Sequence, residues 1–189
     1  MAVNHLKIMP SGDQVLITTS KNVQLSNFSF LSEWSDANST QNLLAVAVDG
    51  SYFVTAGSNR VRKYTGNGNL TWDRRLPGGN AQALAYSRDG SRIVIGMDDS
   101  TLHVLNANGI QLWMANASNW ITSVAVSDDG STIAAGSLDK KLYVFDRTGT
   151  MLGTFTARSA IKFNSVAVTG DGSLIVLVDE SAVYGLSRA

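Results

Sequence analysis

The stretch SVAVSDDGSTIAAGSLDKKLYVF, residues 123–145, holds three short apolar runs separated by two polar turns. The first turn is Asp129-Gly130-Ser131 and the second is Asp139-Lys140. Short runs rich in β-branched and aromatic residues, bounded by aspartate and glycine, are typical of antiparallel strands joined by tight turns. The stretch therefore predicts a meander of short strands with no helix.

The glycine of the first turn recurs along the whole chain at intervals of 38 to 42 residues, at Gly12, Gly50, Gly90, Gly130 and Gly172. A period near forty residues is typical of a repeat architecture, in which small sheets stack because none can bury its apolar faces alone. We predict an all-β chain forming a single domain over residues 1–189. Its five repeats are expected at residues 4–41, 42–82, 83–122, 123–164 and 165–189.

Two patterns predict how the repeats pack. The run Leu174–Val178 is apolar at every position, which favours a strand covered on both faces rather than one. An aromatic residue also closes the fourth strand of four repeats, and we interpret these residues as wedges between neighbouring sheets. They are Trp34, Trp72, Trp113 and Phe155.

Two segments carry a resemblance to known repeat families. The unit spanning Val124–Ser127, Asp129-Gly130, Ala134–Ser137 and Leu142–Asp146 resembles a WD-repeat blade. The segment Asn106–Trp113 is similar to blades of pyrroloquinoline-quinone-type (quinoprotein-like) propellers. The resemblance implies a β-propeller of about five blades of antiparallel four-stranded sheets. No repeat has the Gly-His pair with which a WD-repeat blade begins, so that family's hydrogen-bonded tetrad is not expected.

The last repeat has only three strands, so the fifth blade is expected to be incomplete with an open edge. Three readings follow: the chain is a fragment of a longer propeller, the ring closes imperfectly, or the edge accepts a strand from another chain. The candidate open-edge residues are Val183, Tyr184 and Leu186.

Composition narrows the possible functions. The formal net charge is zero, which argues against nucleic-acid binding through a general basic excess. The chain has no cysteine, which excludes disulfides and thiolate chemistry. No apolar stretch is long enough to span a bilayer, and the N-terminus does not resemble a signal peptide.

Residues capable of chemistry are scarce. His103 alternates with apolar neighbours within a predicted strand, and Asp98-Asp99 falls in a predicted hairpin turn, where aspartate caps the backbone. The only other histidine is His5. We therefore predict no catalytic residues, no cofactor and no metal, and hence no enzyme.

The loops that join one repeat to the next are the second candidate binding surface, because loops on a rigid scaffold commonly carry function. Trp120 is the one tryptophan outside the periodic position, and tryptophan and arginine are frequent at interface hot spots. The alternative is that Trp120 only covers its blade and the cations are ordinary solvated charge. The candidate residues are Trp120, Arg74, Arg75, Arg158 and Lys162.

We predict a non-catalytic protein-interaction or structural scaffold, whose contact is a protein partner or a second copy. Four glycosylation sequons, at Asn27, Asn38, Asn69 and Asn116, favour an extracytoplasmic or cell-surface protein over a cytoplasmic one. The alternatives are a degenerate quinoprotein-like oxidoreductase and a carbohydrate-binding propeller.

Overall fold

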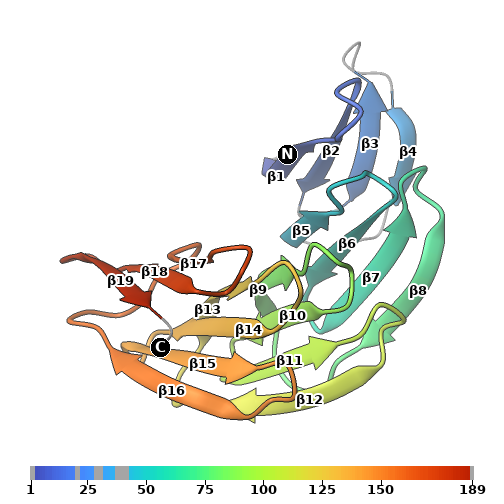
Figure 1. Cartoon of the computed structure of the whole chain (residues 1–189). Helices are drawn as coiled ribbons and strands as arrows, with labels where there is room; N and C mark the ends of the chain where they lie inside the picture. Colours follow the sequence, from blue (N-terminus) through green and yellow to red (C-terminus); the bar gives the residue numbers. More distant parts are fainter. Residues whose placement is uncertain (1–2, 20–21, 28–31, 37–42, 188–189) are drawn as a thin grey trace. The chain divides into compact units, whose positions relative to one another are not determined.

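The computed structural model describes residues 3–19, 22–27, 32–36 and 43–187, and all regular structure in these ranges is β-strand. The described strands form five antiparallel sheets, four of four strands and one of three (Figure 1). The predicted propeller with an incomplete last blade is confirmed. No helix able to cross a membrane occurs in the described ranges.

The chain divides into two compact units, Met1–Pro77 and Gly78–Ala189. The first unit holds the first two sheets, and each follows the order of its strands along the chain. The first sheet is β1 (Val3–Ile8), β2 (Gln14–Thr19), β3 (Val23–Asn27) and β4 (Ser32–Asp36), and the second is β5 (Leu43–Val46), β6 (Tyr52–Gly57), β7 (Arg60–Thr65) and β8 (Leu70–Arg75).

The second unit holds the other three sheets, again as meanders of neighbouring strands. The third sheet is β9 (Ala81–Tyr86), β10 (Ile93–Met97), β11 (Thr101–Leu105) and β12 (Gln111–Asn116). The fourth is β13 (Ile121–Val126), β14 (Thr132–Ser137), β15 (Lys141–Asp146) and β16 (Met151–Thr156), and the fifth is β17 (Val166–Val168), β18 (Leu174–Val178) and β19 (Val183–Ser187). That all 189 residues form a single domain stays a prediction.

The repeated Asp-Gly turn joins the first two strands of a sheet. In the fourth sheet, Asp129 Oδ1 accepts hydrogen bonds from the Ser131 amide at 2.9 Å and the Ser127 hydroxyl at 2.8 Å. Gly130 has φ +70°, a conformation that glycine adopts without the strain that a side chain brings. The turn is therefore fixed by hydrogen bonds and backbone preferences of neighbouring residues, and for this reason the sequence predicts it.

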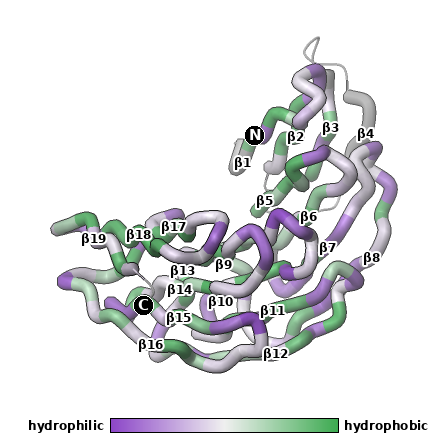
Figure 2. The backbone as a smooth tube through the Cα atoms, in the orientation of Figure 1, coloured by the Kyte–Doolittle hydropathy of each residue, from purple (hydrophilic) through white to green (hydrophobic). Residues whose placement is uncertain are grey.

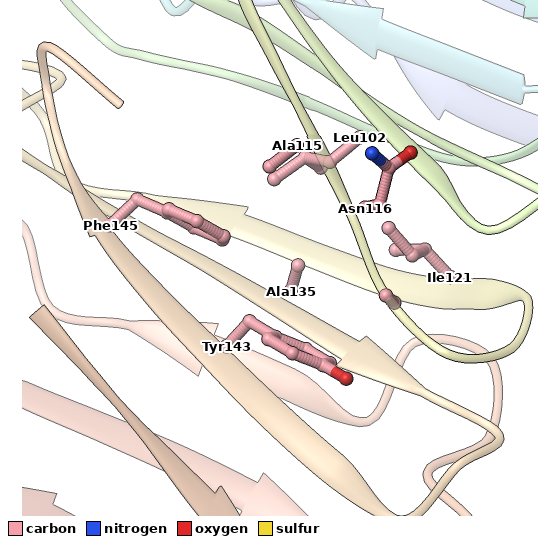
Figure 3. A pocket seen from close by; sticks show the side chains of 8 residues that line it. Leu102, Ala115, Asn116, Ile121, Ala135, Tyr143 and Phe145 are labelled. Atoms are coloured by element: carbon pink, nitrogen blue, oxygen red, sulfur yellow. The ribbon is translucent and has the colours of Figure 1, made fainter. Parts of the chain in front are cut away.

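Apolar side chains from facing sheets form the cores. In the first unit one cluster joins the first two sheets, and it includes the stacked rings of Phe53 and Tyr64, whose centroids are 4.9 Å apart. In the second unit one cluster joins the third and fourth sheets and another joins the fourth and fifth. The space beside Tyr143 and Phe145, between the third and fourth sheets, leaves no room for a water molecule (Figure 3).

The prediction that second strands are covered on both faces is confirmed for β10 and β14, whose residues are all buried. It is wrong for Leu174–Val178, the strand β18. Ile175 and Leu177 pack into the cluster shared with the fourth sheet, whereas Leu174 and Val178 are 37% and 41% exposed. These two side chains lie on the opposite face of the strand, because successive residues alternate.

A glycine in the second strand lets the next sheet approach closely. A Cβ at Gly136 in β14 would lie 2.5 Å from Ile161 Cγ2 and 2.9 Å from Val166 Cγ2. Gly96 in β10 has the same relation to Ile121, at 2.5 Å. These positions therefore require glycine for packing rather than for backbone conformation.

Candidate functional site

The loop that leads into the fourth sheet is held by an aspartate in the hairpin turn between β14 and β15. Asp139 Oδ2 accepts hydrogen bonds from the Ser118 amide at 3.0 Å and the Tyr143 hydroxyl at 2.5 Å. Asp139 Oδ1 accepts one from the Lys141 amide at 2.8 Å, which caps the turn. The Asp139 carboxylate therefore connects the loop before the fourth sheet, the turn between β14 and β15, and strand β15. These hydrogen bonds involve no Gly-His pair of the kind that begins a WD-repeat blade.

The same arrangement recurs in the sheets on either side. The Gly79 amide donates to Asp99 Oδ2 at 3.0 Å, and the Ser159 amide donates to Asp179 Oδ2 at 2.9 Å. The Thr101 amide donates to Asp99 Oδ1, so the predicted capping of the hairpin turn is confirmed for Asp99. It is wrong for Asp98, whose carboxylate accepts instead from the amide and side chain of Asn80. Within the described ranges no three acidic or histidine side chains gather as they would around a metal ion.

These hydrogen bonds favour the charged form of the aspartates. Amide and hydroxyl donors on Ser131, with the Ser127 hydroxyl, lower the pKa of Asp129 to about 2. The Thr169 hydroxyl and the amide and hydroxyl of Ser173 do the same for the pKa of Asp171. Burial raises the pKa of Asp139, but the hydroxyl and amide donors outweigh burial and the net direction is downward.

Stability is expected to fall in acid because of these carboxylates. Their folded pKa values lie below the unfolded value of about 3.9, so the unfolded state takes up protons first as the pH falls. The melting temperature should be nearly constant from pH 7 to about pH 5 and should drop between about pH 4 and pH 2. Thermal melts across this range test the prediction, and a melting temperature unchanged at about pH 2 would contradict it.

Trp113 in β12 is a wedge between the third and fourth sheets, as predicted. Its ring centroid lies 5.4 Å from that of Phe145, and its Nε1 donates to the Arg147 carbonyl at 3.1 Å. A Cβ at Gly149 would touch the indole at 2.8 Å, so the tryptophan rests on the turn between β15 and β16. Trp72 in β8 is buried, and the side chain of Trp34 lies outside the described part of the chain.

Phe155 packs between the fourth and fifth sheets as predicted, but it does not share the strand position of Trp113. Trp113 pairs with Val104, and the residue of β16 at the matching place, opposite Val144, is Gly153. Phe155 stands opposite Leu142, two residues further on, and packs edge-on against Tyr184 at 5.0 Å. The sequence carries a signal for this: Trp113 lies four residues after the glycine of its turn, Gly109, and Gly153 lies four after Gly149.

A groove of about 590 Å³ lies beside Gly153, between the fourth and fifth sheets. Its walls come from β15 and β16 of the fourth sheet and from β18 and β19 of the fifth, and Figure 2 shows hydrophobic residues along β18 and β19. A Cβ at Gly153 would meet no atom within 4 Å. The lining side chains carry no charge; they are Val144, Leu152, Gly153, Thr154, Phe155, Ile175, Leu186 and Ser187.

The groove runs beside the open edge of the fifth sheet. Strand β19 pairs with β18, and no described strand pairs with its other side. Of the three residues predicted for this edge, Val183 is 70% exposed and Leu186 lines the groove. Tyr184 packs against Phe155 of the fourth sheet, and its hydroxyl donates to Asp179 Oδ2, in the turn between β18 and β19, at 3.1 Å.

The predicted loop residues are distributed over both units. Arg74 and Arg75 were predicted in a loop, but they are the last residues of strand β8 in the first unit. The Arg74 guanidinium lies 5.9 Å from the Trp72 ring of the same strand. Trp120, in the second unit, is 43% exposed.

The other two loop cations lie in the loop between β16 and β17 of the second unit. Lys162 forms an ion pair with Glu180, and the Arg158 amide donates to the Tyr184 hydroxyl. Phe163, which sequence reasoning missed, lies in the same loop and is 54% exposed.

The remaining candidates are structural. His103 is fully buried, and its two ring nitrogens contact the Thr101 hydroxyl at 3.1 Å and Gln111 Oε1 at 2.8 Å, as expected for a polar residue within a strand. The side chain of His5 lies outside the described part. Of the sequons, those at Asn69 and Asn116 lie within it, that at Asn27 extends out of it, and that at Asn38 lies entirely outside it.

Residues 110–146 match the family model of the WD domain, G-beta repeat. No curated protein matches the chain. The matched residues contain β12 of the third sheet and β13 to β15 of the fourth, so the repeat crosses the boundary between two sheets. Similarity to the pyrroloquinoline-quinone-type propellers stays a prediction. The match therefore covers one repeat of the chain, and the repeated antiparallel sheets are those of a β-propeller.

Proposed function

We propose that this chain is a non-catalytic protein-interaction module, and that the outer edge of β19 accepts an extended segment as a further strand. The observation that carries the proposal is the outer edge of β19, with which no strand of the described residues pairs. An unpaired strand edge offers backbone N–H and C=O groups to any extended chain. Addition of a strand to such an edge is a recurrent mode of peptide recognition.

The surroundings of β19 support this mode of binding. The groove beside it exposes apolar side chains of both sheets, including Leu152 and Leu186. A segment added to β19 would satisfy its own backbone through the new hydrogen bonds while covering this apolar surface. The site needs no catalytic group, in accord with the scarcity of such residues in the sequence.

Hydrogen exchange tests the proposal directly. The probe is a synthetic peptide with the sequence of Gly149–Ala157, which contains the chain's own fourth strand β16. We expect it to slow amide exchange in β19 (Val183–Ser187), because new backbone bonds protect those amides. The control is the same peptide with prolines at two central positions, which cannot donate to a ladder. Unchanged exchange in β19 at saturating peptide would overturn the proposal.

A second candidate surface is favoured by the exposed rings of Trp120 and Phe163. These residues lie in consecutive loops that lead into the fourth and fifth sheets. Arg158 and Lys162 add cations to the second of these loops, whereas Arg74 and Arg75 belong to the other unit. Once a natural partner is known, Trp120→Ala should abolish binding if this surface is used and leave binding intact if the partner uses β19. An extracytoplasmic location stays a prediction from the sequence.

A further inference from the structure

The hairpin of β7 and β8 concentrates positive charge in a chain whose formal net charge is zero (Figure 1). Residues 60–75, called the basic hairpin below, contain four arginines, one lysine and a single acidic residue, Asp73. Five cations and one carboxylate give this segment a formal charge of +4, so the rest of the chain carries −4. A local excess of one sign raises the concentration of oppositely charged ligands around it.

Strand pairing places two of the arginines directly opposite each other. Arg60 pairs with Arg75, and the next pair along the strands is Val61 with Arg74. Opposite residues of an antiparallel pair have Cβ atoms about 5 Å apart, and like charges in this arrangement are destabilising. Both Arg60 and Arg75 are exposed. The hairpin therefore presents two neighbouring guanidinium groups at the surface at a cost in stability.

The one carboxylate of the basic hairpin does not neutralise this pair. Asp73 Oδ2 lies 3.1 Å from Arg60 Nη1 and 3.1 Å from Arg62 Nε, so a single charge is shared by two cations. Arg74 contacts its own strand, through the Asp73 carbonyl and the Trp72 ring. In the ranges that the structure describes, no carboxylate forms an ion pair with Arg74 or Arg75. These two guanidinium groups are available to a ligand.

The fold of a blade does not require opposed arginines. In the third sheet, Thr101 stands opposite Asn116. In the fourth sheet, Lys141 stands opposite Thr156. Each of these pairs, like the arginine pair, stands at the first residue of the third strand of its sheet. The same backbone pairing therefore forms without two cations, and this favours a role in binding for the arginines of the second sheet.

We propose that the basic hairpin binds an acidic segment of a partner protein, with a carboxylate held between Arg60 and Arg75. Guanidinium groups bind carboxylates through two parallel, charge-assisted hydrogen bonds. A carboxylate between the two arginines would replace their repulsion by such bonds, and Arg74 is positioned to attract a neighbouring acidic residue. This inference is independent of strand addition at β19, because it uses side chains of another sheet in the other unit.

Two observations favour an acidic protein segment over other anionic ligands. Single-stranded nucleic acids bind through exposed aromatic rings on which bases stack. In the basic hairpin Trp72 and Tyr64 are buried, and Lys63 covers the neighbouring Tyr52 ring at 4.1 Å. A second copy of the chain is disfavoured because every described carboxylate outside residues 60–75 already accepts a hydrogen bond or forms an ion pair.

The test compares two peptides on the whole chain by calorimetric titration at low salt. One is a peptide of roughly nine residues in which threonine and glutamate alternate, and the other has glutamine at every glutamate position. We expect the glutamate peptide to bind about tenfold more tightly, because charge-assisted hydrogen bonds are the stronger ones. Its advantage should shrink as the salt concentration rises to about 0.5 M, because the contacts are exposed and salt screens them.

Two variants of the chain localise the effect. Arg60→Thr/Arg75→Asn gives the hairpin the residues of the third sheet, so it should fold and lose the preference for the glutamate peptide. The matched control, Arg88→Gln/Arg158→Gln, removes two exposed charges from the second unit and should keep the preference. Thermal melts check that both variants fold. If the first does not, the two peptides on the wild-type chain and their salt dependence decide the question.

Three results would overturn the proposal. The first is equal binding of the two peptides to the wild-type chain, or a preference that survives in folded Arg60→Thr/Arg75→Asn. The second is tighter binding of an oligouridylate of the same charge, which would assign the hairpin to nucleic acid. The third is a dimer in light scattering that the glutamate peptide dissociates, which would identify a second copy as the ligand. None of these results changes the hydrogen exchange of β19, so the proposed function is tested separately.

Discussion

Replacing Gly136 by valine is expected to lower the free energy of unfolding by about 3 kcal/mol, because the new side chain overpacks a closed interface. Its Cβ alone would lie 2.5 Å from Ile161 and 2.9 Å from Val166, and both residues belong to the core shared with the fifth sheet. In a chain of this length the melting temperature should fall by roughly 6–12 °C. Urea unfolding and thermal melts measure the effect.

The same substitution at Gly153 is the matched control. Gly153 lies in the same sheet, but a Cβ there would meet no atom within 4 Å. Because glycine within a strand is less stable than alanine by roughly 0.5–1 kcal/mol, Gly153→Val should leave stability unchanged or raise it slightly. Equal losses for the two variants would show that glycine is required for the backbone and not for the approach of the next sheet.

Replacing Trp113 by alanine is the other change with a large expected effect, a loss of about 3 kcal/mol. The alanine removes the packing on Phe145 and the surface resting on Gly149, and it leaves the Arg147 carbonyl without the indole donor. The expected loss in free energy of unfolding is at the low end for replacing a large core side chain by alanine, because Trp113 is only half-buried. Denaturant unfolding followed by circular dichroism measures the loss.

Trp120→Ala serves as the comparison for that measurement. Trp120 is 43% exposed, and a substitution away from packed features usually changes stability by no more than about 0.5 kcal/mol. The test compares the loss in free energy of unfolding of the two variants. A larger loss for Trp120→Ala than for Trp113→Ala would contradict the role of Trp113 as a packing residue between the third and fourth sheets.

The strand position of Phe155 shows what a periodic pattern can miss. Aromatic residues at intervals near forty suggested one shared position, but the pairing of β15 with β16 assigns that position to Gly153. A strand register is decided by the backbone bonds that follow the turn, and a shift of two residues keeps a side chain on the same face. Phe155 therefore still packs toward the fifth sheet, where it meets Tyr184.

The sequence by itself determined the strands, the turns and the forty-residue repeat, because Asp-Gly turns and short apolar runs act through local backbone chemistry. Only the tertiary structure decided which residues face one another across two sheets. The groove, the exposed face of β18 and the carboxylate ties from Asp99, Asp139 and Asp179 to the loops all depend on contacts between segments far apart in the chain. Close packing sets such contacts, and no local sequence pattern encodes them.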